Sequence, residues 1–170
     1  MNVMDVIKTR RSIRKYSSKL VENEKIEKIL EAGRLSPSAA NRQPWHFLVI
    51  TDKELKTRLS EAYSSEWFVS APVILIVCAD PNAAWYRNDG EDYWKVDAAI
   101  AMQSMILEAW EEGLGTCWIA AFKEEPVKQI LEIPPHIRVV AMTPLGYPEE
   151  EKGEVTDRKL RNEIVHFDGW

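Results

Sequence analysis

The segment from Val96 to Trp110 constrains the fold more than any other part of the sequence. Eleven of its 15 residues are apolar, and they occupy all sides of a helix instead of a single stripe. A helix with this pattern must lie at the centre of its domain, or it must be covered on its second side by another subunit. We therefore expect a fold that is built around this helix.

Helices and strands alternate along the rest of the chain. Apolar residues at helical spacing predict helices at 3–9, 23–34, 55–62 and 127–131. Apolar runs between turn residues predict strands at 46–50, 73–78, 114–120 and 137–142. The run 73–78 contains no polar residue, which indicates burial on both faces. The sequence shows no repeat or linker, so we expect one α/β or α+β sandwich domain over residues 1–170.

Composition excludes several classes of protein. The net charge of −5 argues against nucleic acid as a partner, because phosphate backbones select basic surfaces. No apolar run approaches the roughly 20 residues of a membrane helix, so we expect no contact with a membrane. The N-terminus has no apolar signal core, and Cys78 and Cys117 lie in apolar segments that predict buried, reduced thiols. We therefore expect a cytoplasmic protein.

Motifs of side-chain catalysis are also missing. The sequence has no phosphate-binding P-loop and no nucleophile elbow, and the glycines at 113 and 115 form only part of a dinucleotide motif. His46, His136 and His166 lack metal-ligand spacing, so we expect no metal site. A bound redox cofactor would supply chemistry that these side chains cannot.

A basic cluster stands out against the acidic background. The first twenty residues contain six basic side chains and a single acid, Asp5. Within them, Arg10, Arg11, Ser12 and Arg14 have the guanidinium and hydroxyl donors that a phosphomonoester site requires. The alternative is a solvated basic helix end, which also suits the negative end of the helix dipole.

Two further segments carry donors suited to a flat heterocycle. The loop at 36–45 combines polar groups with a backbone held by prolines; alternatively, Ser38 and Asn41 only bond the backbone of a connection. The turn after residues 117–119 offers N–H groups at Ala120 and Ala121; alternatively, it is a buried strand end with a tryptophan in the core.

The acidic tail contains two features of its own. Arg158 is a candidate anion ligand or a surface ion-pair partner. The tail ends in apolar residues up to Trp170, which predicts an arm that docks on a partner chain.

Together, and in this order, these segments resemble the nitroreductase family of FMN proteins. The resemblance covers nearly the whole chain and is carried by residues 10–16, 36–47, 96–101, 113–122, 145–148, 158 and 163–166. It implies an α+β, three-layer sandwich with a central, mostly antiparallel sheet flanked by helices. It also implies a homodimer with FMN at the subunit interface.

The resemblance assigns a role to each segment. The residues that it implies for the FMN phosphate and ribityl chain are Arg10, Arg11, Ser12, Arg14 and Arg158. Those that it implies to reach the flavin from the partner subunit are Pro37, Ser38 and Asn41. Those that it implies to lie along the isoalloxazine ring are Trp118, Ile119, Ala120 and Ala121, with the last two amides near N5. The chain departs from the family pattern at Thr156-Asp157, where Lys-Pro is common, and at Ala121, where glycine is frequent.

The implied activity needs no catalytic side chain. Tightly bound FMN would accept electrons from transiently docked NAD(P)H and pass them, in ping-pong order, to a nitroaromatic, quinone or other electron-poor small molecule. Three alternatives stay open at this point: a specialised relative such as a reductive dehalogenase, a non-catalytic flavin-binding or redox-sensing protein, and a flavin-free module that binds acidic partners through its basic N-terminus.

Overall fold

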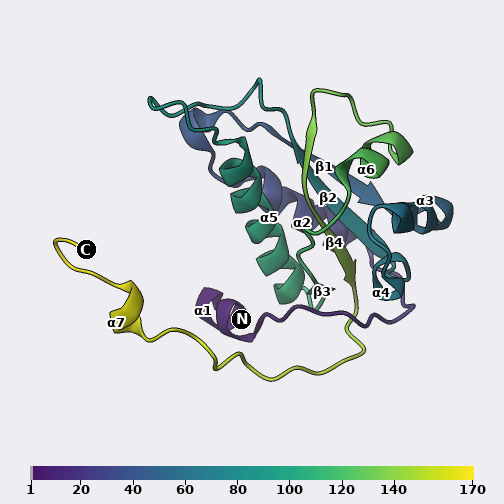
Figure 1. Cartoon of the computed structure of the whole chain (residues 1–170). Helices are drawn as coiled ribbons and strands as arrows, with labels where there is room; N and C mark the ends of the chain where they lie inside the picture. The colour runs from purple at the N-terminus through teal and green to yellow at the C-terminus, as the bar shows by residue number, and fades with distance from the viewer. Residues whose placement is uncertain (1) are drawn as a thin grey trace.

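The computed structural model describes residues 2–170. Its sheet has four antiparallel strands in the order β1-β2-β4-β3 (Figure 1). The strands are β1 (Trp45–Ile50), β2 (Val73–Ala79), β3 (Gly115–Thr116) and β4 (Arg138–Gly146). Every residue of β2 is buried, which confirms the prediction of a strand covered on both faces.

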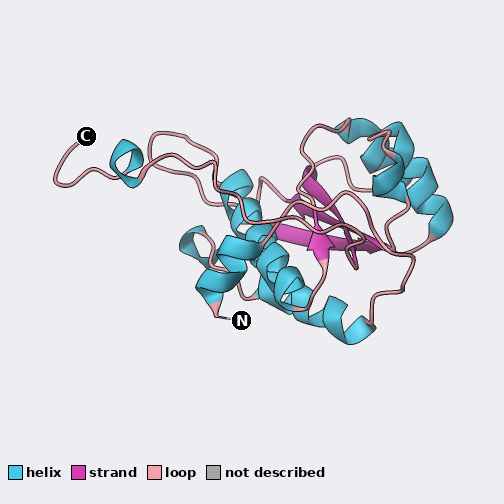
Figure 2. Ribbon diagram, turned by 90° about the horizontal axis from the view of Figure 1, so that it is seen from below, coloured by secondary structure: helices cyan, strands magenta, loops and turns pink. Residues whose placement is uncertain are grey.

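Helices cover both faces of this sheet (Figures 1 and 2). The α-helices are α1 (Val3–Thr9), α2 (Asn23–Arg34), α3 (Lys53–Arg58), α4 (Glu66–Val69), α5 (Trp94–Glu111), α6 (Glu124–Ile130) and α7 (Arg161–Ile164). Two short 3₁₀ turns, η1 (Ala39–Asn41) and η2 (Leu59–Glu61), complete the set. One core cluster joins the sheet to α2 and α5, and a second joins it to α3, α4, α6 and η2. This is the expected α+β, three-layer arrangement.

Helix α5 packs against one face of the sheet and against α2, so a single chain does not bury it on all sides. Its buried side includes Ala98, Met102 and Met105. Gly33 allows α2 to approach closely, because a Cβ at that position would lie 2.8 Å from the Met105 side chain. The other side of α5 is only partly covered within one chain. Val96 and Ile100 are 43% and 38% exposed, so an apolar surface stays open.

The predicted strand at 114–120 is wrong in its extent. Gly115 pairs with Gly146, and Ile119 forms an isolated bridge to Met142. This register sets Cys117 opposite a proline, Pro144, which has no N–H to donate to the ladder. The Cys117 N–H instead donates to the Thr143 hydroxyl at 2.9 Å. The strand therefore stops at Thr116 because of a residue on the neighbouring strand.

The last twenty-odd residues extend away from the sheet as an arm (Figures 1 and 2). Its apolar side chains are open to solvent: Phe167 is 79% exposed, and Trp170 is fully exposed. Cys78 and Cys117 are free and buried, as predicted. No helix within residues 2–170 is long and apolar enough to cross a membrane.

Candidate functional site

The basic segment at residues 10–14 leaves α1 and runs beside β3. Ser12 forms a parallel bridge with Thr116, and the Ile13 N–H donates to the Thr116 carbonyl oxygen at 2.8 Å. Ile13 is almost completely buried. Because side chains alternate along an extended segment, Ser12 and Arg14 lie on the side away from Ile13.

Three arginines gather at this segment, and none of them forms an ion pair with another described residue. Burial lowers the pKa of Arg10, and the neighbouring positive charges of Arg158 and Arg11 lower it further. The fold thus brings together two of the predicted phosphate ligands, Arg10 and Arg158, from opposite ends of the sequence. Within residues 2–170, no carboxylate lies at ion-pair distance from any of these three guanidinium groups. Unpaired guanidinium groups held close together form a site for an anion.

Arg14 has a different environment. Its guanidinium carbon lies 5.9 Å from the centre of the Trp67 ring, and its backbone N–H donates to Glu150 Oε1 at 2.5 Å. Its charge also opposes the effect of burial, which raises the pKa of the Cys117 thiol. Arg14 therefore lies at the edge of the basic cluster.

Gly115 lets the basic segment approach the sheet. A Cβ at this position would lie 2.7 Å from Cγ1 and 2.8 Å from Cβ of Ile13. The Ile13 Cβ cannot move alone, because its backbone is bonded to Thr116. A side chain at residue 115 would therefore displace the segment that carries Arg10 and Ser12.

Gly115→Ala is accordingly expected to destabilise the protein by about 1–3 kcal/mol, the usual cost of overpacking. Urea unfolding of the two proteins measures the difference. Gly153→Ala is the matched control, since a Cβ there meets nothing within 4 Å, and its effect should be about 0.5 kcal/mol or less. Equal stabilities for the two variants would contradict the role of Gly115.

The second predicted segment, the loop at 36–45 (here called the Ser-Pro-Ser loop), is attached to α5 at two points. The hydroxyl groups of Ser36 and Ser104 are hydrogen-bonded at 2.8 Å. The Ala39 N–H donates to Asp97 Oδ1 at 2.9 Å. The position of this loop is thus set by two residues of α5, Asp97 near its N-terminal end and Ser104 in its second half.

The polar side chains of the loop close it internally. Ser38 Oγ accepts the Gln43 N–H at 2.9 Å, and Asn41 Oδ1 accepts the Gln43 side-chain amide at 3.1 Å. These are the backbone and local contacts that the alternative interpretation of the loop expects. Ala40, Asn41 and Gln43 have φ angles of 49°, 55° and 49°. Such angles strain non-glycine residues by on the order of 1 kcal/mol each, so the loop needs its attachment to α5. Pro37, which belongs to the same loop, is exposed.

Asp97 holds this loop, and the sequence analysis assigned it no role. It is 1% exposed, and its second carboxylate oxygen, Oδ2, has no hydrogen-bond partner among the described residues. Burial raises the pKa of Asp97, and the bond from Ala39 partly offsets this. A signal was present, because Asp97 is the only charged residue between 96 and 107.

Asp97→Asn is expected to gain stability relative to the wild type as the pH rises above about 4. The folded-state pKa of Asp97 lies above its unfolded value, so the wild type loses stability as pH rises between these two values. The amide keeps an oxygen for Ala39 but carries no charge. Urea unfolding of both proteins from about pH 4 to about pH 8 tests this; a constant difference in stability would contradict it.

The third predicted segment follows β3. Ile119 is 4% exposed, whereas Trp118 is 37% exposed and is therefore not the core residue that the alternative interpretation expects. Ala120 and Ala121 are exposed, and their N–H groups donate to no other described residue. The predicted role of these two N–H groups toward a ligand stays a prediction.

These segments form two groups at opposite ends of α5. The Trp110 indole N–H donates to the Thr9 hydroxyl at 2.9 Å, which places the neighbouring Arg10 at the C-terminal end of the helix. The Ser-Pro-Ser loop is bonded to Asp97 near the N-terminal end. At about 1.5 Å per residue, Trp110 lies about 20 Å along the axis from Asp97 and about 9 Å from Ser104, the second point of attachment. The Ala39 end of the loop therefore lies toward the opposite end of α5 from Arg10.

Within residues 2–170, the structure contains no cluster that could hold a metal ion. His46 and His136 do line one groove of about 430 Å³, next to Cys78 and Asp80. Even so, no three His, Cys, Asp or Glu side chains converge among the described residues.

Comparison with known proteins extends the similarity over the whole chain. The profile of the "Nitroreductase family" matches residues 7–71 and 60–147, which include the three site segments before the tail. A protein of Archaeoglobus fulgidus with the provisional name NADH dehydrogenase/NAD(P)H nitroreductase is 37% identical over 174 aligned positions, covering 98% of each chain. A nitroreductase family protein from Clostridium difficile 630 has a TM-score of 0.92 at 30% identity, covering 100% of both chains. An FMN-dependent nitroreductase from Clostridium difficile R20291 has a TM-score of 0.85 at 34% identity, covering 98% of this chain and 99% of that one.

Proposed function

Because this chain belongs to the nitroreductase family, we propose that it is an NAD(P)H-dependent oxidoreductase that binds FMN tightly. In this proposal the whole chain forms one flavin-binding domain. It transfers electrons from NAD(P)H, in ping-pong order, to a nitroaromatic, quinone or other electron-poor small molecule. The two free thiols are compatible with a cytoplasmic protein.

The cluster of unpaired arginines is the observation that carries the proposal. Arg10, Arg11 and Arg158 provide charge for a terminal phosphate, with the Ser12 hydroxyl beside them and Arg14 at the edge. This cluster is partly open to solvent, so it suits the terminal monophosphate of FMN better than the internal pyrophosphate of FAD, which would be buried. The cluster therefore favours FMN over FAD. Bound FMN would supply the two-electron chemistry of its ring.

The exposed end of the third segment suits the ring of the same cofactor. The free N–H groups of Ala120 and Ala121 would donate to ring acceptors, and Trp118 and Ile119 lie directly before them. Neutral main-chain donors can orient the ring without any titrating side chain. The proposal therefore requires no catalytic acid or base from the chain.

The remaining site residues would come from a second copy. In a two-fold dimer with the two α5 helices antiparallel, the N-terminal half of one α5 lies beside the C-terminal end of the other. Pro37, Ser38 and Asn41 of one copy would then face the arginines of its partner. This arrangement unites the two groups that one chain keeps apart.

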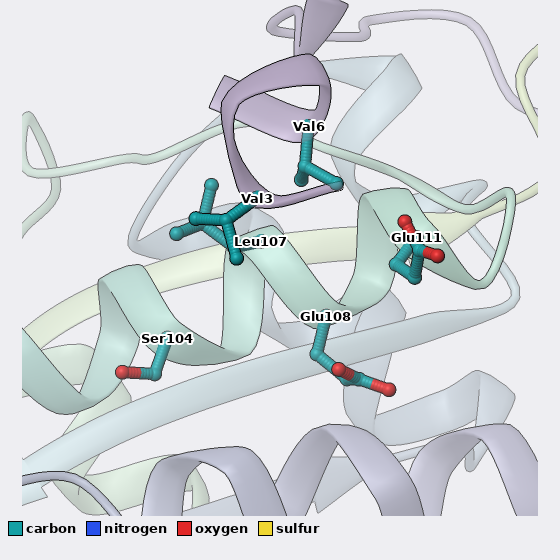
Figure 3. Close-up of a pocket in the computed structure, with 6 residues that line it drawn as sticks. All are labelled: Val3, Val6, Ser104, Leu107, Glu108 and Glu111. Carbon is teal, nitrogen blue, oxygen red and sulfur yellow. The ribbon is translucent and has the colours of Figure 1, made fainter. Parts of the chain in front are cut away.

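The surface of α1 and α5 supports such a dimer. Val3, Met4 and Ile7 of α1 are 72%, 56% and 49% exposed, and Val3 lines a groove together with residues of α5. Figure 3 shows a groove of about 380 Å³ where the two helices meet, lined by Val6 and Leu107 among others. Together with the apolar arm, this surface is suited to a permanent interface, typically more than about 2,000 Å².

Flavin analysis and kinetics test the proposal. The purified protein is expected to be yellow and to release FMN on heating. Steady-state oxidation of NAD(P)H with a quinone acceptor should give parallel double-reciprocal lines, as expected for ping-pong order. Release of FAD, or no binding when excess FMN is added, would exclude the proposed cofactor. Bound FMN without NAD(P)H oxidation would instead indicate a non-catalytic flavin protein.

A further inference from the structure

We propose that Lys152 is an additional ligand of the flavin phosphate and that Glu150 competes with the phosphate for it. This inference rests on the proposed FMN site. It concerns a residue outside the segments that resemble the family.

The chain after β4 returns along the basic segment. The Ser17 N–H donates to the Tyr147 carbonyl oxygen at 2.8 Å, and the Glu149 N–H donates to the Lys15 carbonyl oxygen at 3.0 Å. The two stretches are antiparallel here, since Tyr16 also bridges Pro148. Residues after 149 therefore run toward residues 12–14.

Lys152 reaches the basic cluster from this returning stretch. Its Nζ donates to the Ser12 carbonyl oxygen at 2.8 Å, and its side chain is only 24% exposed. Its charge acts on the Cys117 thiol together with the charges of Arg14 and Arg10 and the hydroxyl of Ser12. The ammonium group thus lies among the groups that the proposal assigns to the phosphate.

Lys152 supplies a positive charge that the tail lacks just before Arg158. The resemblance leads us to expect a lysine two residues before Arg158, but the chain has Thr156 there and an acid, Asp157, after it. Lys152 lies a few residues earlier and is held at Ser12 by the hydrogen bond to its carbonyl oxygen. A lysine binds phosphate as a point charge, so it needs proximity more than a fixed orientation.

Glu150 occupies the lysine that the proposal assigns to the phosphate. Its Oε1 accepts the Arg14 backbone N–H at 2.5 Å and pairs with Lys152 Nζ at 2.8 Å. These bonds, the first more than the second, lower the pKa of Glu150. The carboxylate therefore stands where an anion is favoured, and a bound phosphate must share Lys152 with it.

Binding of FMN and of riboflavin separates the phosphate from the rest of the flavin. Fluorescence titration of the full-length apoprotein with each ligand is the measurement. Lys152→Met, which keeps the aliphatic stem, is expected to weaken FMN binding roughly 10-fold. Riboflavin, which has no phosphate, should bind this variant as it binds the wild type. Lys159→Met, in the exposed tail beside Arg158, is the matched control and should leave both affinities unchanged.

A second variant acts in the opposite direction. Glu150→Gln keeps an oxygen for the Arg14 N–H but frees Lys152 from its ion pair, so FMN should bind up to about five-fold more tightly. Riboflavin affinity should again stay constant. This result decides the question even if Lys152→Met fails to fold.

The outcomes that overturn the inference are specific. An equal loss of FMN and riboflavin affinity in Lys152→Met would show that the lysine only anchors Ser12. Unchanged FMN affinity in Lys152→Met, or weaker FMN binding in Glu150→Gln, would also exclude it. Failure of the wild type to bind FMN would instead refute the proposed function.

Discussion

Arg10→Ala is expected to weaken FMN binding by roughly ten- to a hundred-fold, because it removes charge-assisted hydrogen bonds to the phosphate. The pKa of Arg10 is lowered, first by burial and then by the positive charges of Arg158 and Arg11. These groups repel one another until an anion arrives. Arg10→Ala should therefore lower the stability of the protein only when FMN is present.

The apoprotein provides the contrasting measurement. Removing Arg10 relieves repulsion and breaks no ion pair of the described residues, so the stability of the apoprotein should stay equal or increase. The stabilisation conferred by a fixed FMN concentration should fall at the same time, because that stabilisation depends on the ratio of ligand concentration to Kd. Thermal unfolding with and without FMN, together with a fluorescence titration, measures both effects.

Lys19→Ala is the control for general electrostatics. Lys19 belongs to the same basic stretch, but its Nζ lies 3.2 Å from Glu22 and 3.9 Å from the centre of the Tyr147 ring. It already has its partners and lies outside the cluster. Equal FMN affinities for the wild type, Arg10→Ala and Lys19→Ala would show that Arg10 does not bind the phosphate and would contradict the proposed phosphate site.

Ile100→Asp is expected to convert the proposed dimer into monomers and to cause loss of flavin. Ile100 is 38% exposed on the open side of α5, so an aspartate stays solvated in the monomer and the chain should still fold. In a two-fold interface the same change is made twice, and each buried, unpaired charge costs several kcal/mol. Dissociation should become at least about 1,000-fold more favourable.

Sedimentation velocity on the flavin-loaded protein measures the oligomeric state, and absorbance measures the flavin. Gln129→Glu adds one negative charge on α6, on the other face of the sheet, and should change neither. A monomeric variant that keeps FMN would contradict the shared site. A wild type that is an active, flavin-loaded monomer would refute the dimer itself.

The sequence by itself determined the elements whose burial follows from local patterns of apolar residues. The apolar residues on all sides of 96–110 predicted a helix that needs cover on more than one side, and the unbroken run 73–78 predicted the buried strand β2. Both depend only on residues a few positions apart, because helical and extended periods are local. The basic composition of residues 8–19 likewise indicated an anion site without any knowledge of the fold.

Only the tertiary structure decided which of these groups meet. Pro144 ends β3 from the neighbouring strand, and Arg158 joins Arg10 from the far end of the chain. Lys152 reaches Ser12 only because the chain after β4 returns along the basic segment. Strand pairing and charge clustering of this kind are contacts between distant residues, and no local periodicity records them. The length of α5 separates Asp97, which holds the Ser-Pro-Ser loop, from Trp110, which lies beside Arg10, by about 20 Å, and in the proposed dimer a second copy completes the site.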